Sequence, residues 1–300
     1  MIFETKNKIG ARFQLKVHKG DGVAIRESEW FDNIVLDSGL ARMSVDTWID
    51  RCCVGTGNTE PLASQVSLSS FRASTLVKQA AYLDGNTSVE PYYWGGTIVW
   101  RFGAGLASGN LSEVGLGWGN FTLWNRALIR DNAGNPTTIT VLSGEFLDVT
   151  ATVRVYPEPV ISGAFNLMDK NNNIISGHTY TGIPCITRYG EFYANKVSLT
   201  INSYTGSMGE GITTSPNGTE TSWTSQANTF PTGTSLQCVA SLSLSQGNLS
   251  HQSFKLMPNI MSFSGNKGGY KLQIDPPISK NSSQSLEVTF VLSWGRYEPT

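Results

Sequence analysis

Charged side chains are scarce in this chain of 300 residues. They make up 15% of the residues, whereas roughly 25% is usual in a globular protein. The formal net charge is −1, so there is no basic excess that would hold a phosphate backbone, and we expect no nucleic-acid partner. The composition is also unlike that of a helical enzyme, because Gly, Ser, Thr and Asn fill the spaces between apolar residues.

Long apolar runs are absent as well. No stretch of about 18 apolar residues exists that could cross a bilayer, and "MIFETKNKIGARF" lacks the apolar centre of a secretory signal. We therefore expect no membrane insertion and a protein that stays in the cytoplasm until it is assembled with its partners.

Cysteine and histidine are few and widely spaced. No C-x-x-C, H-x-x-x-H or nucleophile motif is present, so the sequence predicts no zinc site, no cofactor and no histidine-based catalysis. The cysteines are expected to be thiols in a reducing compartment, although a bridge between Cys185 and Cys238 stays open. The residues concerned are Cys52, Cys53, Cys185 and Cys238, and His18, His178 and His251.

Period-two alternation is the clearest pattern that is present. It occurs in 13–17, 149–155, 197–201, 238–244 and 288–294, and it is typical of antiparallel strands with one face on a core and the other in water. At the end of the first of these strands, His18 is expected on the wet face. Helical patterning is weak: 39–53 is expected to form a short helix, and 74–83 is ambiguous. The sequence thus predicts an all-β fold with one or two short helices.

An internal repeat divides the chain. "LDVTATVRVYPEP" begins at Leu147 and "LEVTFVLSWGRYEP" begins at Leu286, 139 residues later, while "GNLS" occurs at Gly109 and again at Gly247, 138 residues later. Two segments that recur in order at nearly one offset predict two related β-sandwich domains, 1–157 and 158–300. The prolines of "YPEPV" (156–160) are expected to stiffen the joint between them.

Three polar or glycine-rich stretches resemble ligand loops but fail the chemical requirements. "RDNAGNP" (130–136) offers one carboxylate, and "MDKNNNIISG" (168–177) lacks the glycine and the final glutamate of a calcium loop. "FGAGLASGN" (102–110) has its third glycine one position late for a dinucleotide loop. We expect a turn at each of the first two, because Asp and Asn cap their own backbone and Gly134 permits positive φ.

Catalytic carboxylates are not indicated. The candidates for paired acids in the first copy are Glu113, Asp131, Glu145 and Asp148. At the offset of 138, Glu113 corresponds to His251, so the repeat does not share an acid there. Each carboxylate also has an ordinary role on a turn or a wet face, and the chain is predicted not to be an enzyme.

Aromatic residues provide the candidate interaction surface. Trp100 lies on an alternating strand and is expected in the core, whereas Trp118 and Trp124 lie in "GLGWGNFTLWNRA" next to Arg126. Exposed aromatics beside polar residues anchor protein interfaces and sugar-binding surfaces. We therefore predict that Trp118, Trp124 and Arg126 contribute to such a surface.

One segment resembles a known class of proteins. The elements "NLSEVGL" (110–116) and "NRALIRDNAGNPTTITV" (125–141), followed by an L-x-V-T strand, are similar to a segment that recurs in virion proteins of tailed bacteriophages, and "VGTGNTEP" (54–61) resembles a phrase upstream of it. The likeness covers most of the first copy and carries over no catalytic residue.

The resemblance implies a structural role in the virion. The protein is expected in the tail, as a baseplate, adaptor or fibre component, with capsid decoration or a carbohydrate-binding or receptor-binding tail protein as alternatives. The implied partners are other virion proteins and copies of the chain itself, in a ring or trimer, with a host surface glycan as a further candidate partner.

Overall fold

The computed structural model describes residues 2–187, 193–223, 225–260 and 268–298. In this part of the chain nearly all regular structure is β, with twenty-three strands and one short helix, α1 (Asp37–Arg42). The predicted all-β, sandwich-like class is therefore confirmed. Within these ranges no helix has the length and apolar character needed to cross a bilayer.

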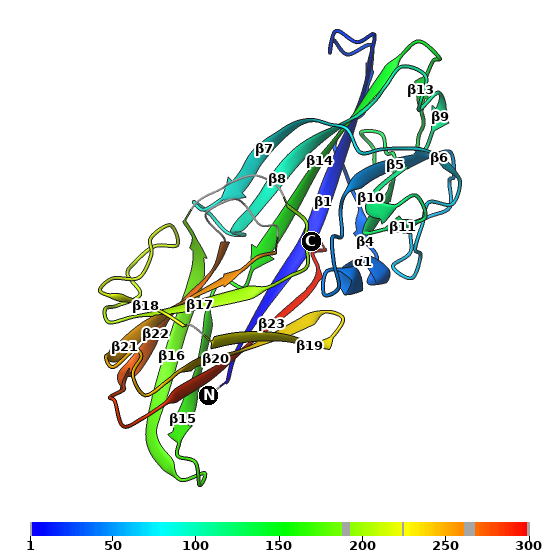
Figure 1. The fold of residues 1–300 in the computed structure, drawn as a ribbon. Helices are drawn as coiled ribbons and strands as arrows, with labels where there is room; N and C mark the ends of the chain where they lie inside the picture. Colours follow the sequence, from blue (N-terminus) through cyan, green and yellow to red (C-terminus); the bar gives the residue numbers. More distant parts are fainter. Residues whose placement is uncertain (1, 188–192, 224, 261–267, 299–300) are drawn as a thin grey trace.

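A central sheet of nine strands runs through the whole molecule (Figure 1). Seven strands form its continuous path, in the order β19 (Ser225–Thr232), β20 (Ser235–Leu242), β23 (Leu286–Arg296), β1 (Ile2–His18), β14 (Phe146–Pro157), β8 (Tyr93–Phe102) and β7 (Lys78–Asn86). The short strands β2 (Arg26–Glu27) and β3 (Phe31–Asp32) pair with β1 beyond the end of β23. All of these pairs are antiparallel except that between β1 and β23.

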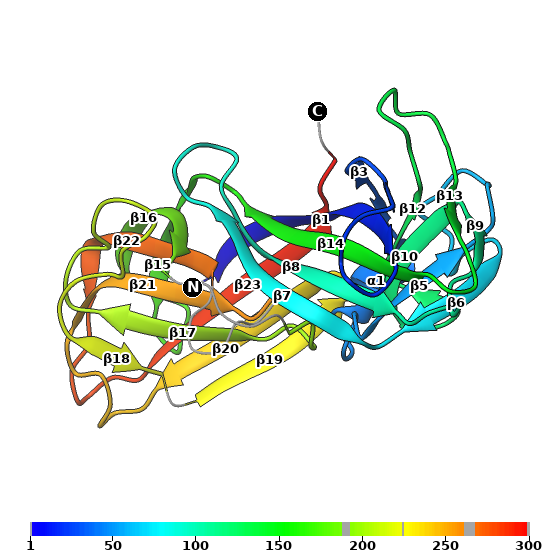
Figure 2. The same ribbon diagram turned by 90° about the horizontal axis from the view of Figure 1, so that it is seen from above.

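Two smaller sheets pack at opposite ends of the central sheet, as the two views in Figures 1 and 2 show. The sheet of the first half contains β4 (Ile34–Val35), β12 (Asn125–Leu128), β10 (Glu113–Gly119), β5 (Arg51–Gly55) and β6 (Phe71–Thr75), with β11 (Thr122–Leu123) on β10. The sheet of the second half contains β15 (Ile161–Met168), β16 (Ile174–Ile186), β22 (Gly268–Ser279), β21 (Ser250–Pro258), β17 (Leu199–Tyr204) and β18 (Glu220–Ser222). A separate pair joins β13 (Ile139–Val141) to β9 (Gly109–Leu111).

The alternating residues point into the cores between these sheets. Phe13, Leu15 and Val17 of β1 are fully buried, and so are Val149 and Val153 of β14. Because successive side chains of a strand point to opposite faces, the polar residues between them lie on the outer face of the central sheet. Trp100 is fully buried, as expected.

The strands of the two halves pair in the same order. In the first half β5 pairs with β6 and β10, and β8 pairs with β7 and β14; in the second half β17 pairs with β18 and β21, and β20 pairs with β19 and β23. The repeated sequence segments lie in corresponding strands, because β14 contains the first and β23 the second. The domain limits 1–157 and 158–300 stay a prediction.

Strand β1 is shared by the two halves. Its residues Ile2–Ile9 pair with β23, whereas Asn7–His18 pair with β14. Phe3 is fully buried, and its ring centroid lies 4.6 Å from that of Phe290 and 5.2 Å from that of Phe165. The first strand of the chain thus contributes to the core of the second half.

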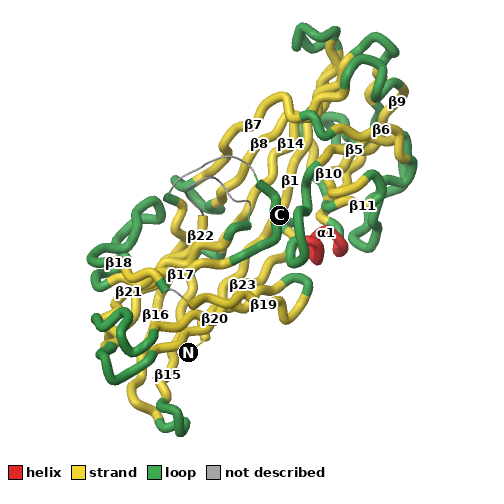
Figure 3. The backbone as a smooth tube through the Cα atoms, viewed as in Figure 1, coloured by secondary structure: helices red, strands yellow, loops and turns green. Residues whose placement is uncertain are grey.

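The structure corrects the extent of the predicted helix and decides the ambiguous stretch. The helix expected over 39–53 is limited to the six residues of α1, Asp37–Arg42. At the end of the expected range, Arg51–Gly55 form β5 instead. Cys52, Cys53 and Val54 are all fully buried, and the cross-strand bonds to β10 hold this segment extended. The ambiguous stretch 74–83 lies in β6 and β7, with no helix (Figure 3).

Candidate functional site

A buried ion pair lies where the small sheet of the first half meets the loop 56–70. Glu113 begins β10 and Arg126 lies on the neighbouring strand β12, and both side chains have no exposed surface. The Glu113 Oε2 oxygen is 2.7 Å from Arg126 Nη2 and 2.9 Å from Nε. Antiparallel pairing of Val114 with Ala127 brings the two side chains onto the same face.

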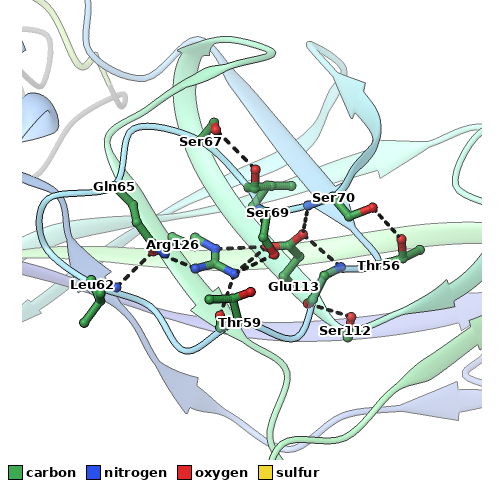
Figure 4. Close-up of polar contacts among 12 residues, drawn as sticks. Thr56, Thr59, Leu62, Gln65, Ser67, Ser69, Ser70, Ser112, Glu113 and Arg126 are labelled. Carbon is green, nitrogen blue, oxygen red and sulfur yellow. Dashed lines mark hydrogen bonds and ion pairs between the residues drawn. The ribbon is translucent and has the colours of Figure 1, made fainter.

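Backbone N–H groups of the loop donate the remaining hydrogen bonds to Glu113 (Figure 4). Its carboxylate accepts hydrogen bonds from the backbone N–H groups of Gly57 at 3.0 Å, Ser69 at 3.0 Å and Ser70 at 2.7 Å. A carboxylate has room for about four such bonds, so this one is fully used by the protein.

Arg126 is bound as completely as Glu113. Besides the carboxylate, its guanidinium donates to Gln65 Oε1 at 2.6 Å, to the carbonyl of Thr59 at 2.7 Å and to Ser69 Oγ at 3.1 Å. Buried charges are tolerated where they are paired and hydrogen-bonded in this way. The arrangement is closed to solvent, so it holds the loop on the sheet and offers no group to a substrate.

Close approach at the ion pair requires glycine. A Cβ atom at Gly57 would lie 1.8 Å from Ser69 Oγ and 2.5 Å from Glu113 Oε1, and a Cβ at Gly55 would lie 2.4 Å from the Ser70 carbonyl oxygen. No other residue fits at these two positions without displacing the loop.

The ion pair joins three segments of the first half. Glu113 is the acid of "NLSEVGL" and Arg126 the base of "NRALIRDNAGNP", while Gly57 and Thr59 belong to "VGTGNTEP". Segments that are separate in sequence are thus bonded to one another in the fold. We call this buried contact the interior clasp.

The predicted surface of Trp118, Trp124 and Arg126 is wrong for two of its three members. Trp124 and Arg126 are completely buried, and the Trp124 ring packs against Trp48 with centroids 5.0 Å apart. Trp118 is partly buried, and the Arg42 guanidinium lies 5.4 Å from its ring centroid. Of these three residues, only Trp118 keeps an exposed part that a partner can contact.

The stretch Asp131–Asn135 forms the expected turn. Asp131 Oδ1 accepts hydrogen bonds from the backbone N–H groups of Ala133 and Asn135, both at 2.9 Å, and Gly134 has a φ of +80°. Arg130 donates to the Gly134 carbonyl at 2.8 Å and closes the loop from the other side. The turn is therefore stabilised by its own residues.

The turn at Asp169 is built in the same way. Asp169 Oδ1 accepts from the N–H groups of Asn171 at 2.8 Å and Asn173 at 2.9 Å, and Asn172 has a φ of +63°. In both turns the aspartate caps the N–H groups two and four residues ahead, and the residue between them is left-handed. No group of three or more His, Cys, Asp or Glu side chains that could hold a metal ion occurs in the described residues.

These two turns predict a loss of stability in acid. The N–H of Asn135 lowers the pKa of Asp131, and the side-chain amide of Asn173 lowers that of Asp169. A carboxylate whose pKa is lower in the folded than in the unfolded protein stabilises the fold above the unfolded pKa of about 3.9. This stabilisation is lost as the pH falls through the folded pKa. In the Asp131→Asn/Asp169→Asn variant each turn keeps the one oxygen that accepts the backbone N–H groups but loses the charge. Its free energy of unfolding should therefore fall less below about pH 4. Urea unfolding at several acidic pH values would measure this, and equal pH dependence in parent and variant would contradict it.

The three histidines all lie in packed positions. His18 was expected on a wet face, but it is fully buried, 3.2 Å from Asp148 Oδ2, and its Nδ1 accepts from the N–H of Gly20 at 2.9 Å. Its ring is stacked on Phe146, which covers this part of the outer face. His178 and His251 are also buried, and burial lowers the pKa of His251.

The remaining candidate carboxylates form ion pairs, and the thiols are buried. Asp148 forms an ion pair with Arg101 and Glu145 one with Arg26. All four cysteines are free and buried, so Cys185 and Cys238 are not bridged. Burial raises the pKa of Cys53 to about 12 and that of Cys238 to about 11, which leaves these thiols protonated.

No family model, no curated protein and no solved structure matches the chain. Its function therefore has to be argued from its own residues and from the segment at the ion pair.

Proposed function

We propose that the protein is a structural component of a tailed-phage virion, built into the tail and acting through contacts with other virion proteins and with copies of itself. The resembling segment supports this role, because its residues form the interior clasp of the first half. Low charge and sandwich architecture suit a protein that packs against neighbours. In this proposal the chain is assembled in the host cytoplasm and is not an enzyme.

The observation that carries the proposal is the free edge strand β7. It lies at the border of the nine-stranded sheet and pairs only with β8 in the described part of the chain (Figure 2). Tyr82 and Leu83 on this strand are 60% and 50% exposed, and Leu76 and Val77 just before it are exposed as well. An apolar edge with unpaired backbone groups is suited to pairing with another chain.

A second copy of the chain is the occupant that the geometry favours. Antiparallel pairing of β7 with the β7 of another molecule would satisfy the edge N–H and C=O groups of both and bury the apolar side chains of both in one step. Such a twofold contact leaves the rest of the surface, including Trp118, for other virion proteins.

The Tyr82→Lys/Leu83→Lys variant should then fail to self-associate, because charged residues on an edge oppose strand pairing. Sedimentation velocity should show an oligomer for the parent and a monomer for the variant. Leu244→Lys is the matched control, since Leu244 is 54% exposed and lies outside β7. The proposal would be wrong if the parent protein is strictly monomeric and absent from purified phage particles. If the protein is instead recovered with heads that lack tails, its place would be the capsid surface and its role capsid decoration.

A further inference from the structure

A serine and a histidine lie side by side on strand β16 of the second half. Ser176 Oγ is 2.6 Å from His178 Nε2, and the two side chains share one face because they are two residues apart on a strand. Both line a pocket of about 360 Å³ between β15, β16, β22 and the segment 280–285 that follows β22. We call them the serine–histidine pair.

The hydrogen bonds decide which nitrogen of His178 carries the proton. Nδ1 is 2.6 Å from the carbonyl oxygen of Pro276, which can only accept, so Nδ1 is the donor. Nε2 of the neutral ring is then unprotonated and accepts the hydroxyl proton of Ser176. Phe165 is stacked on the buried ring, with centroids 5.2 Å apart and planes inclined by 12°, and fixes its orientation. A serine hydroxyl that donates to an oriented imidazole is the arrangement that activates serine as a nucleophile.

The serine of this pair is open to the pocket. Ser176 is partly exposed and lines the pocket, while His178 lies behind it with 6% of its surface exposed. A second serine–histidine contact in the described residues joins Ser203 Oγ to His251 Nδ1 at 2.8 Å, but both residues are fully buried there. Ser203 Oγ also accepts from Trp223 Nε1 at 2.9 Å. Of these two contacts, only the one at Ser176 can meet a reagent from solution.

The rest of the pocket wall is largely apolar and includes one positive charge. The Lys280 ammonium, with Nζ 2.8 Å from Asn248 Oδ1, can stabilise the negative charge that develops on a carbonyl oxygen during acyl transfer. An acyl chain can pack on the apolar side chains, whereas a phosphate ester would have to move charged oxygens out of water against them. The apolar residues concerned are Leu167, Met168, Ile175, Pro277, Ile278 and Leu286.

We propose that Ser176 is a nucleophilic serine that takes an acyl group from an ester with an apolar acyl chain. Ser176 Oγ attacks the carbonyl carbon of the ester while its proton passes to His178 Nε2. The bond between that carbon and the leaving alcohol oxygen then breaks, and the alcohol departs with the proton from Nε2. Ser176 is left as an acyl ester, and no further reactant is consumed.

This modification site goes beyond the proposed virion role and does not rest on it. A single acyl transfer per chain requires no turnover, so it is compatible with a structural protein that is not an enzyme. The serine–histidine pair lies on the sheet of the second half, whereas β7 lies at the border of the central sheet. The Tyr82→Lys/Leu83→Lys variant should therefore be acylated at the rate of the parent, whether or not it self-associates.

The test is incubation of the full chain with p-nitrophenyl hexanoate, followed by acid quenching, intact-mass measurement and peptide mapping. One hexanoyl group per chain is expected, on Ser176. Ser176→Ala should abolish this adduct, and His178→Gln should slow its formation at least about a hundredfold, as is usual when a general base is lost. p-Nitrophenyl phosphate is the second reagent and should leave the chain unmodified, because the pocket wall is largely apolar.

Two other serines of the same chain are the matched controls. Ser285 lines the same pocket and is exposed but makes no hydrogen bond to a histidine in the described residues, whereas Ser203 has a histidine partner but no exposure. Neither should be acylated at a comparable rate. The comparison with Ser285 is made within the parent, so it holds even if His178→Gln does not fold, which its melting temperature would show.

Three results would overturn the proposal. The first is the absence of an acyl group on Ser176 of the parent. The second is acylation of Ser285 as fast as that of Ser176, because exposure alone would then explain the reaction. The third is a folded His178→Gln variant that reacts at the rate of the parent. Phosphorylation of Ser176 by the second reagent would likewise contradict the choice of an acyl donor.

Discussion

Replacing Glu113 by alanine is expected to lower the free energy of unfolding by about 3–5 kcal/mol, as is usual when one member of a buried ion pair is removed. The change leaves the Arg126 guanidinium buried without its counter-ion and strips the N–H groups of Gly57, Ser69 and Ser70 of their acceptor. Urea unfolding of parent and variant would measure the loss. In limited proteolysis of the variant, the loop 56–70 should be cleaved before the rest of the chain.

The exposed pair Arg12–Asp32 is the control for this experiment. Its side chains are about half exposed, so Arg12→Ala should change the free energy of unfolding by no more than about 1 kcal/mol. In a double-mutant cycle, Glu113→Ala and Arg126→Met together should cost clearly less than the sum of the two single changes, since no unpaired charge remains. Additive losses would show that the two residues act independently.

Replacing Phe3 by alanine is expected to cost about 3–5 kcal/mol, although Phe3 is only the third residue of the chain. Its ring is fully buried and contacts Phe165, Tyr180 and Phe290 of the second half. A large loss here would show that β1 is part of the second core. Thermal or urea unfolding gives the value.

Ile2 provides the neighbouring control. It points to the opposite face and is 60% exposed, so Ile2→Ala should alter stability by no more than about 0.5 kcal/mol. A fragment 158–300 should likewise be unstable alone and recover on addition of a peptide of residues 1–9, because that peptide can take the place of β1 beside β23. An independently stable fragment would contradict the shared core.

The strands were predictable from the sequence because their signal is local. Alternation in 13–17 and 149–155 puts one set of side chains on one face whatever the partner is. The turns at Asp131 and Asp169 were predictable for the same reason, since the bonds that form them lie within five residues.

The candidate surface was not predictable in this way. Trp118 and Trp124 were predicted to lie on an interaction surface. A Cβ at Gly115, however, would lie 2.4 Å from the Asn125 carbonyl oxygen, and a Cβ at Gly117 would lie 2.2 Å from that of Thr122. They are glycines because strands approach closely there, and that approach buries Trp124.

The sequence by itself determined the all-β class, the turns and the repeat, because each depends on residues that are near neighbours or on a direct comparison of segments. Only the tertiary structure decided that β1 serves both halves and that Glu113 meets Arg126 in the interior. These depend on which distant strands pair and on how deeply packing buries each charge. That choice is set by the free energy of the whole core, and a local pattern does not contain it.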